Sequence, residues 1–537
     1  MTATPDFALP EISADANPDI TDNATCVAWL EELPLVNVAP SQIRMLDQLQ
    51  ELNRFDMPPA ERLKVLESLH EPACFVQTEQ MKKLANKPLP LTSVENGIFA
   101  HVVEMWGQLL LGYQRCLKHA ADSGLKGETA LICQRGMECV AASMFDHYRV
   151  YRQFPEAWWK ELHQLYRYAE EAGESATPVE DKARKTEVSC AETYVGALLL
   201  AMANPNEQSQ RQLAQIRRWL DIWAERVPIR RAAPEEKSLP LLMVDFSALS
   251  GAFREADAAG RSASRWLDIG ELASTLKKRV VLLRKGETPA SMGLGEDASM
   301  PGVEQKMVFL FRVWCEGKNG RILAHRSVSD KAQVTSSIAS MNYHISGNIF
   351  RQPGHATELT KKQRDEIATL GRINTHEDSD YSHTQGYLVE NWLIRNENLE
   401  GFHIERPAAS SGSRYTHSQL IAVRPTDAKG FMVGTIRWLM TDKNGALHAG
   451  IRAIPGLPQA VAVRPTGINA QSEKFIPALY CPEIAALHVP ASLILPPGWY
   501  KPKRVVEVYS EGSASLLLTG IIDRGNDFER VSIELVR

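Results

Sequence analysis

The 537-residue sequence lacks the features that mark membrane-spanning and exported proteins. No apolar run approaches the roughly 18 to 20 residues that a membrane-spanning helix requires, and the segment Tyr194 to Met202 is among the longest. The first basic residue is Arg44, so the N-terminus has no basic start of an export signal. We therefore expect a cytoplasmic protein without a transmembrane segment.

Signatures of common enzyme and metal sites are also missing. The eight cysteines form no Cys-x-x-Cys pair, which favours reduced, buried thiols over a zinc or disulfide role. The sequence has no Gly-x-Ser-x-Gly elbow and no His-Glu-x-x-His helix. One polar cluster, His376-Glu377-Asp378 with His383, is interpreted as solvated loop residues. We expect no enzymatic activity, no bound metal and no cofactor.

Composition indicates a globular protein with little attraction for polyanions. Hydrophobic residues make up 44% and charged residues 23% of the chain, the balance of a folded globular protein. The net charge of -5 disfavours a protein that depends on non-specific contacts with a nucleic-acid backbone. We expect no nucleic-acid polymer as partner, and the length predicts about three domains.

The N-terminal part is predicted to be helical. Residues 1–25 are rich in Asp, Pro, Ala and Thr and are predicted to form a disordered acidic tail. Apolar residues then recur at helical spacing over residues 26–230, with short links that carry Gly, Pro or Asn. This pattern predicts an all-α bundle or array. Such arrays present grooves, so we expect this domain to engage a protein partner.

The second part is predicted to be rich in strands. Residues 241–350 are interpreted as a mixed α/β region that ends in a small β-domain, with Val280 to Leu283 as one of its strands. Regular strand signals follow over residues 364–465, where Asp442 to Gly445 is a strong hairpin-turn signal. These strands favour a small closed barrel, and residues 470–537 are predicted to add a C-terminal β extension. The fold class is therefore α+β multidomain, with an N-terminal all-α domain and small antiparallel β-barrels.

One polar loop carries a family resemblance. The stretch Arg395 to Gly401 reads Arg-Asn-Glu-Asn-Leu-Glu-Gly, and it is followed by apolar Leu420 to Val423 and by Gly434 to Leu439. In this order the segments resemble the PilZ family of bacterial cyclic di-GMP receptors, over residues 364–465. Asn398 stands where the family's Asn-x-Ser-x-x-Gly loop usually has serine. The resemblance implies cyclic di-GMP as the ligand, with loop contacts from Asn396, Asn398 and Gly401.

The loop residues suit a purine base, but the arginines that usually bind the ligand's phosphates in this family are missing. Asparagine offers a donor and an acceptor to a base edge, and glycine permits close backbone approach. The family's Arg-x-x-x-Arg pair has no match upstream of Asn396, and Arg326 is expected to belong to a preceding domain. We assign phosphate contacts to Arg395 and Arg372, with two further candidates, Arg414 and Arg424. The plain alternative for the loop is an Asx turn between two strands.

These observations lead to two functional hypotheses. The first is a bacterial signalling or regulatory protein in the cytoplasm, not an enzyme, whose PilZ-like barrel binds cyclic di-GMP and whose helical domain engages a protein partner. The second is a non-enzymatic scaffold with a degenerate barrel that binds no nucleotide. Cyclic di-GMP binding separates the two hypotheses.

Overall fold

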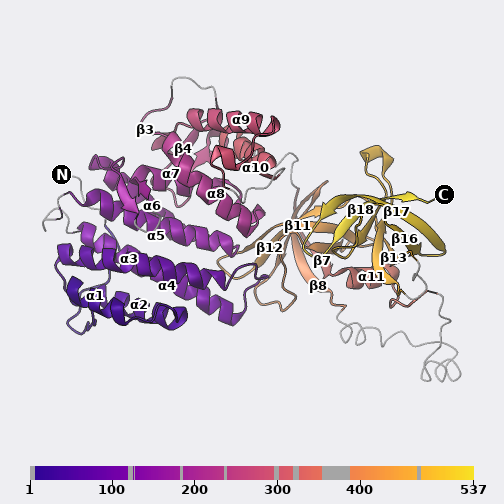
Figure 1. Ribbon diagram of the computed structural model, residues 1–537, viewed down its shortest axis with the longest axis horizontal. Coiled ribbons are helices and arrows are strands. Elements are labelled where there is room, and N and C mark those ends of the chain that lie inside the picture. Colours follow the sequence, from indigo (N-terminus) through magenta and orange to yellow (C-terminus); the bar gives the residue numbers. More distant parts are fainter. Residues whose placement is uncertain are drawn as a thin grey trace. The chain divides into compact units, whose positions relative to one another are not determined.

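The protein comprises two compact units, which we describe separately. The computed structural model describes residues 6–118, 125, 127–181, 186–234, 239–295, 302–317, 326–353, 387–467 and 473–536. The first unit is Met1–Lys87 with Leu91–Arg321, and the second is Pro88–Pro90 with Ile322–Arg537. Helices dominate the indigo to magenta part of the chain, and strands dominate the orange to yellow part (Figure 1).

The first unit is mainly helical, as predicted. Local sequence sets the helix starts: Ser189 and Glu192 cap each other's backbone N–H groups, at 3.2 and 2.6 Å, where α7 begins. The helices are α1 (Asn23–Glu32), α2 (Val38–Leu52), α3 (Pro59–Lys82), α4 (Ser93–Lys118), α5 (Thr129–Arg149), α6 (Glu156–Glu171), α7 (Cys190–Met202) and α8 (Gln210–Trp223). A short hairpin, β1 (Val179–Asp181) with β2 (Thr186–Val188), lies between α6 and α7.

The end of the first unit differs from the prediction. It contains a four-stranded sheet in the order β3 (Ile229–Arg230), β6 (Arg265–Leu267), β4 (Leu242–Val244), β5 (Phe253–Arg254). Two helices follow, α9 (Gly270–Arg284) and α10 (Gly302–Phe311). The predicted strand at Val280 to Leu283 is wrong, because these residues form the last turns of α9. A short run of β-branched and leucine residues fits a strand or a helix equally well, and here it continues the helix that precedes it.

The expected disordered tail over residues 1–25 is wrong where the structure describes it. Phe7 is 5% exposed and Ile20 is fully buried. Asp22 caps α1 by accepting the N–H of Thr25 at 2.8 Å. Widely spaced apolar residues pack here without a regular period, which is why the composition suggested disorder.

The second unit contains two closed antiparallel barrels, which confirms the predicted fold class. The first closes in the order β10-β11-β12-β9-β8-β7 and the second in the order β13-β14-β15-β18-β17-β16. The first comprises β7 (Arg326–Ser336), β8 (Glu390–Asn398), β9 (Gly401–Arg406), β10 (Leu420–Pro425), β11 (Met432–Thr441) and β12 (Leu447–Ala453). The second comprises β13 (Gln459–Pro465), β14 (Ile476–Cys481), β15 (Ser492–Leu495), β16 (Val505–Tyr509), β17 (Ser513–Arg524) and β18 (Glu529–Leu535).

The predicted boundaries within the β-rich part need two corrections. Strand β7 closes the first barrel between β8 and β10, so a separate small β-domain at the end of residues 241–350 is wrong. Strand β13 belongs to the second barrel and not to a barrel over residues 364–465. Pairing between strands far apart in the chain sets both boundaries, and strand patterns alone do not reveal such partners.

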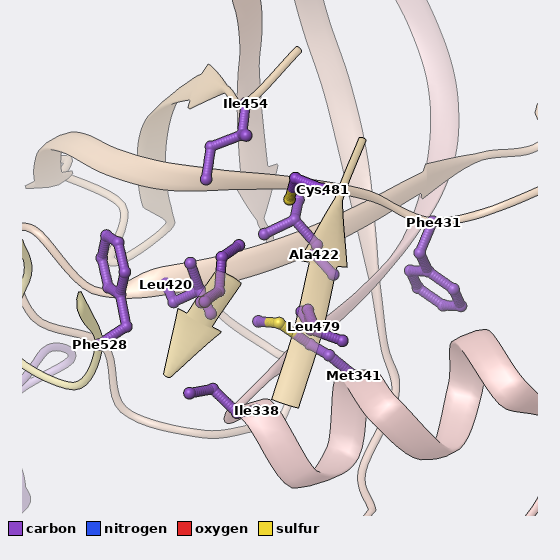
Figure 2. Close-up of a cluster of buried hydrophobic side chains, with 11 residues drawn as sticks. Ile338, Met341, Leu420, Ala422, Phe431, Ile454, Leu479, Cys481 and Phe528 are labelled. Carbon is purple, nitrogen blue, oxygen red and sulfur yellow. The ribbon is translucent and has the colours of Figure 1, made fainter. Parts of the chain in front are cut away.

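The two barrels of this unit share one core. Figure 2 shows Ile338 and Met341 of α11 (Ile338–Ser346) beside Leu420 of the first barrel and Leu479 of the second. Asn342 of the same helix donates to the carbonyl groups of Val461 and Ala478 at 3.0 and 2.9 Å. The helix therefore packs against both barrels.

Candidate functional site

The loop over Asn396 to Gly401 is a tight hairpin between β8 and β9. The side-chain oxygen of Asn398 accepts the N–H groups of Glu400 and Gly401 at 2.8 and 2.9 Å, which is the Asx turn of the plain alternative. A Cβ on Gly401 would lie 1.8 Å from the carbonyl oxygen of Ile451, so the position requires glycine. Asn398 thus has a structural role, and its amide nitrogen remains for other contacts.

Two rows of residues cross the outer wall of the first barrel beside this hairpin. Trp438, Gly450, His403 and Asn396 are successive register partners on β11, β12, β9 and β8. The neighbouring row consists of Arg452, Gly401 and Asn398. Side chains alternate along a strand, and the buried Ile404 and Ile451 point inward. Residues in the two rows therefore point outward. We call this surface the Asn396 face: Asn396, Asn398, Gly401, His403, Arg437, Trp438, Gly450 and Arg452.

Gly450 lets Trp438 lie flat on the Asn396 face. A Cβ at position 450 would be 1.8 Å from the indole Nε1 of Trp438, so any other residue would displace the ring. The ring centroid of His403 lies 5.0 Å from that of Trp438. Trp438 remains partly exposed. The sheet therefore offers a flat aromatic surface three strands away from Asn396.

A chain of polar contacts runs from Asn396 along the face. The amide nitrogen of Asn396 is 3.2 Å from Nδ1 of His403. Nε2 of His403 is 3.2 Å from Nδ1 of His448, and Nε2 of His448 is 3.5 Å from Oδ2 of Asp442. Asp442 also accepts the N–H groups of Asn444 and Ala446 in the predicted hairpin turn. These contacts link the loop to the β11–β12 turn.

The arginines named from the sequence are engaged elsewhere or lie outside the described residues. Arg395 makes a bidentate pair with Glu405 at 2.6 and 2.8 Å and thereby lowers the pKa of that carboxyl. Arg414 donates to the carbonyl groups of Pro88 and Pro90, each at 3.0 Å from Nε. Arg424 lies over the ring of Phe431 and bonds Gln333. Arg372 lies outside the described residues, so its assignment stays a prediction.

Other cations flank the loop instead. Arg437 and Arg452 are exposed, and neither forms an ion pair or side-chain hydrogen bond within the part of the chain that the structure describes. Arg326 is also exposed, and it pairs in register with Glu397 because β7 lies beside β8. The expectation that a domain separates Arg326 from the loop is therefore wrong.

Two hollows in the described structure suit a dinucleotide less well than this face. A hollow of about 420 Å³ at the end of the first barrel is lined by Asn398 and Gly401 of this face but also by Glu397 and Asp427, and by no basic residue. Carboxylates repel phosphates, so this hollow disfavours a dianion. A second cavity, beside Glu138 and Arg217 in the helical unit, measures about 80 Å³. Ligand pockets typically measure some 300 to 1,000 Å³, so this one is too small.

Among the described residues, no helix combines the length and hydropathy needed to cross a membrane. The same residues contain no group of three or more His, Cys, Asp or Glu side chains arranged to hold a metal ion. The cluster His376-Glu377-Asp378 with His383 lies outside the described residues.

Several residues of the Asn396 face were not assigned from the sequence. His403, Trp438 and Arg452 come from different strands, and only strand register brings them beside Asn396. One usable signal was present: Gly450 and Arg452 share a face because they are two residues apart on a strand. Their alignment with the loop depends on pairing between β9 and β12, which the sequence does not specify.

Comparison with known proteins identifies the family. Residues 24–235 match the model "Cyclic-di-GMP receptor FimW, N-terminal domain", and residues 461–536 match "FimW C-terminal beta-barrel domain". The chain is similar to the cyclic-di-GMP receptor FimW of Pseudomonas aeruginosa, with 21% identity over 519 residues that cover 87% of this chain and 83% of the relative. Both domain models of one family thus match in order over more than half of the sequence, and the chain belongs to the FimW family, which is named for a cyclic-di-GMP receptor.

Proposed function

We propose that this protein is a non-enzymatic regulator that binds cyclic di-GMP on the Asn396 face of its first barrel. The observation that carries the proposal is the row Trp438-Gly450-His403-Asn396, with Arg452 in the next row. A base-stacking surface, an amide for a base edge and a free cation thus share one outward face. The family's named relative, a cyclic-di-GMP receptor, supports the choice of ligand.

Arg437 and Arg452 are the proposed phosphate partners. A cyclic dinucleotide carries two phosphate charges, and guanidinium groups bind such oxygens in a bidentate way. Burial chiefly, and repulsion from Arg452 to a smaller extent, lower the pKa of Arg530 in the second barrel. An anion bound at Arg452 would relieve this repulsion. These cations replace the paired arginines that the sequence lacks.

Trp438 is the proposed stacking surface for one guanine. Stacking of a base on an aromatic side chain contributes about 1–3 kcal/mol in single-strand binding proteins. Gly401 leaves the sheet surface beside Asn398 without a side chain, so a planar group can approach the backbone there. His403 lies between Trp438 and Asn396 in the row, so we assign the amide groups of Asn396 and Asn398 to the edge of the ligand's other base.

Calorimetric titration with cyclic di-GMP tests the proposal. The wild-type protein is expected to bind cyclic di-GMP saturably, as one molecule or one dimer of the ligand per chain. Asn396→Ala is expected to weaken binding about tenfold, the effect of losing one hydrogen bond of about 1.4 kcal/mol. Asn444→Ala, an exposed asparagine of the β11–β12 turn, is the matched control and should bind as wild type.

Absence of binding in the folded wild-type protein would favour the alternative scaffold with a degenerate barrel. Equal affinities of Asn396→Ala and wild type for cyclic di-GMP would mean that the ligand does not bind on this face. The role of the helical domain in engaging a protein partner stays a prediction, and the calorimetric experiment does not depend on it.

A further inference from the structure

The series of hydrogen-bonded side chains that runs from Asn396 to Asp442, the polar chain, has a defined donor-to-acceptor direction. A carboxylate only accepts hydrogen bonds, so Nε2 of His448 must carry the proton that faces Asp442 at 3.5 Å. In a neutral ring Nδ1 of His448 is then an acceptor, and Nε2 of His403 donates to it at 3.2 Å. Nδ1 of His403 is left as an acceptor for the amide N–H of Asn396, also at 3.2 Å.

This direction fixes the amide of Asn396. Its nitrogen is held toward His403, so its oxygen is turned to the other side and remains available. An asparagine without such a partner can present either end, because its oxygen and nitrogen have nearly the same shape. Asp442, which lies in the β11–β12 turn and has no place in the rows beside the loop, thus determines which end of Asn396 meets a ligand.

We propose that His403, His448 and Asp442 are positioning residues that present the amide oxygen of Asn396 to the ligand and thereby select guanine over adenine. The inference rests on the proposed function and deepens it. Guanine has N–H donors at N1 and at its exocyclic amine, which an amide oxygen accepts. Adenine also has a donor in its exocyclic amine, but that amine lies beside the acceptor N1, which the same oxygen repels, whereas the two donors of guanine are adjacent. The family resemblance and the named relative assign no role to these three residues.

The direction of the chain depends on protons. If either histidine gains a proton, its ring donates through both nitrogens. The donor pattern then reverses as far as Asn396, whose amide must turn its nitrogen outward. Protonation should therefore remove the preference for guanine without removing the site.

Other charged groups surround this chain. Oε2 of Glu405 lies 3.8 Å from Nδ1 of His448, and Arg395 pairs with that carboxylate. Lys443 follows Asp442 in the turn, and Arg437 and Arg452 lie on the same outer face. Added positive charge on a histidine also attracts any dianion. A test must therefore compare two ligands of equal charge.

The test measures dissociation constants of the full-length protein for cyclic di-GMP and cyclic di-AMP at pH 8. The ratio of the two constants cancels the general attraction for a dianion. We expect a preference for cyclic di-GMP of about tenfold, the effect of one hydrogen bond. A melting curve establishes that the protein is folded.

Two variants separate positioning from a structural role. Asp442→Asn keeps an oxygen for the N–H groups of Asn444 and Ala446 but no longer dictates the direction of the chain. It should lose the guanine preference at pH 8 while melting as wild type. His403→Phe keeps a ring beside Trp438 but removes the partner that orients Asn396, so it should also lose the guanine preference. His101→Phe, at an exposed position of α4, is the control and should behave as wild type.

The outcomes distinguish the two proposals. A wild-type protein that binds cyclic di-GMP and cyclic di-AMP with equal affinity overturns the positioning role and leaves the proposed function standing. A wild-type ratio in Asp442→Asn does the same. A folded protein that binds neither dinucleotide overturns the proposed function, and the positioning role with it.

Discussion

Arg452→Glu is expected to weaken cyclic di-GMP binding by at least about a hundredfold. A hydrogen bond to a charged group contributes about 1.5–3 kcal/mol, and about 2.7 kcal/mol corresponds to a hundredfold change in affinity. The new carboxylate also repels the phosphates. Arg452 is exposed and forms no ion pair among the described residues, so its replacement should leave the barrel intact. Calorimetric titration and a melting curve measure the two effects separately.

The matched control is Arg351→Glu, which makes the same change of charge at an exposed arginine on the segment that follows α11. It should reduce affinity only slightly, and the small loss should disappear at high salt because distant charges are screened. A comparable loss in both variants would mean that the overall charge, and not the Asn396 face, controls binding. An unchanged affinity in Arg452→Glu would remove Arg452 from the site.

Glu390→Ala is expected to destabilise the first barrel by about 3–5 kcal/mol, since it breaks a buried ion pair and leaves its partner uncompensated. Glu390 accepts hydrogen bonds from Arg406, Trp392, Tyr415 and the backbone of Ser413, at 2.9, 3.0, 2.9 and 2.6 Å. Arg406 is 3% exposed, so water replaces the lost carboxylate poorly. Denaturant unfolding monitored by tryptophan fluorescence measures the loss.

The same carboxylate predicts an acid dependence. Burial, the largest influence, would raise the pKa of Glu390, but hydrogen bonds from Ser413, Arg406 and Trp392 together hold it below its ordinary value. A lowered pKa stabilises the fold above the pKa of the unfolded chain, about 4.3, and this stability is lost as pH falls through the folded value. We expect the stability gap between wild type and Glu390→Gln to narrow below about pH 4. Glu400→Gln, an exposed change in the hairpin, should show no such gap at any pH.

Local patterns predicted the secondary structure better than the boundaries between domains. Helical periodicity and the Asp442 to Gly445 turn signal depend on neighbouring residues, and both features are present. The assignment of β7 failed because its partners lie far along the chain. Between the end of β7 and the starts of β8 and β10 there are 53 and 83 residues. Burial of Phe7 and Ile20 likewise depends on contacts that no local pattern records.

Only the part of the candidate site that is contiguous in sequence could be predicted. Asn396, Asn398 and Gly401 lie on one hairpin, so a sequence motif could find them. Trp438 and Arg452 reach the same surface through the register of β11, β12 and β9. Arg395 was predicted to bind phosphate because it is adjacent to Asn396 in the sequence. In the structure its guanidinium group instead pairs with Glu405.

The central claim is that cyclic di-GMP lies on the Asn396 face against Trp438. The most direct test is the nitrogen-15 spectrum of the tryptophan indoles, with the Trp438 signal assigned by its disappearance in Trp438→Phe. Addition of cyclic di-GMP should shift the Trp438 signal saturably, while Trp219, buried in the first unit, stays in place. Saturable binding that leaves the Trp438 signal unmoved would contradict the account.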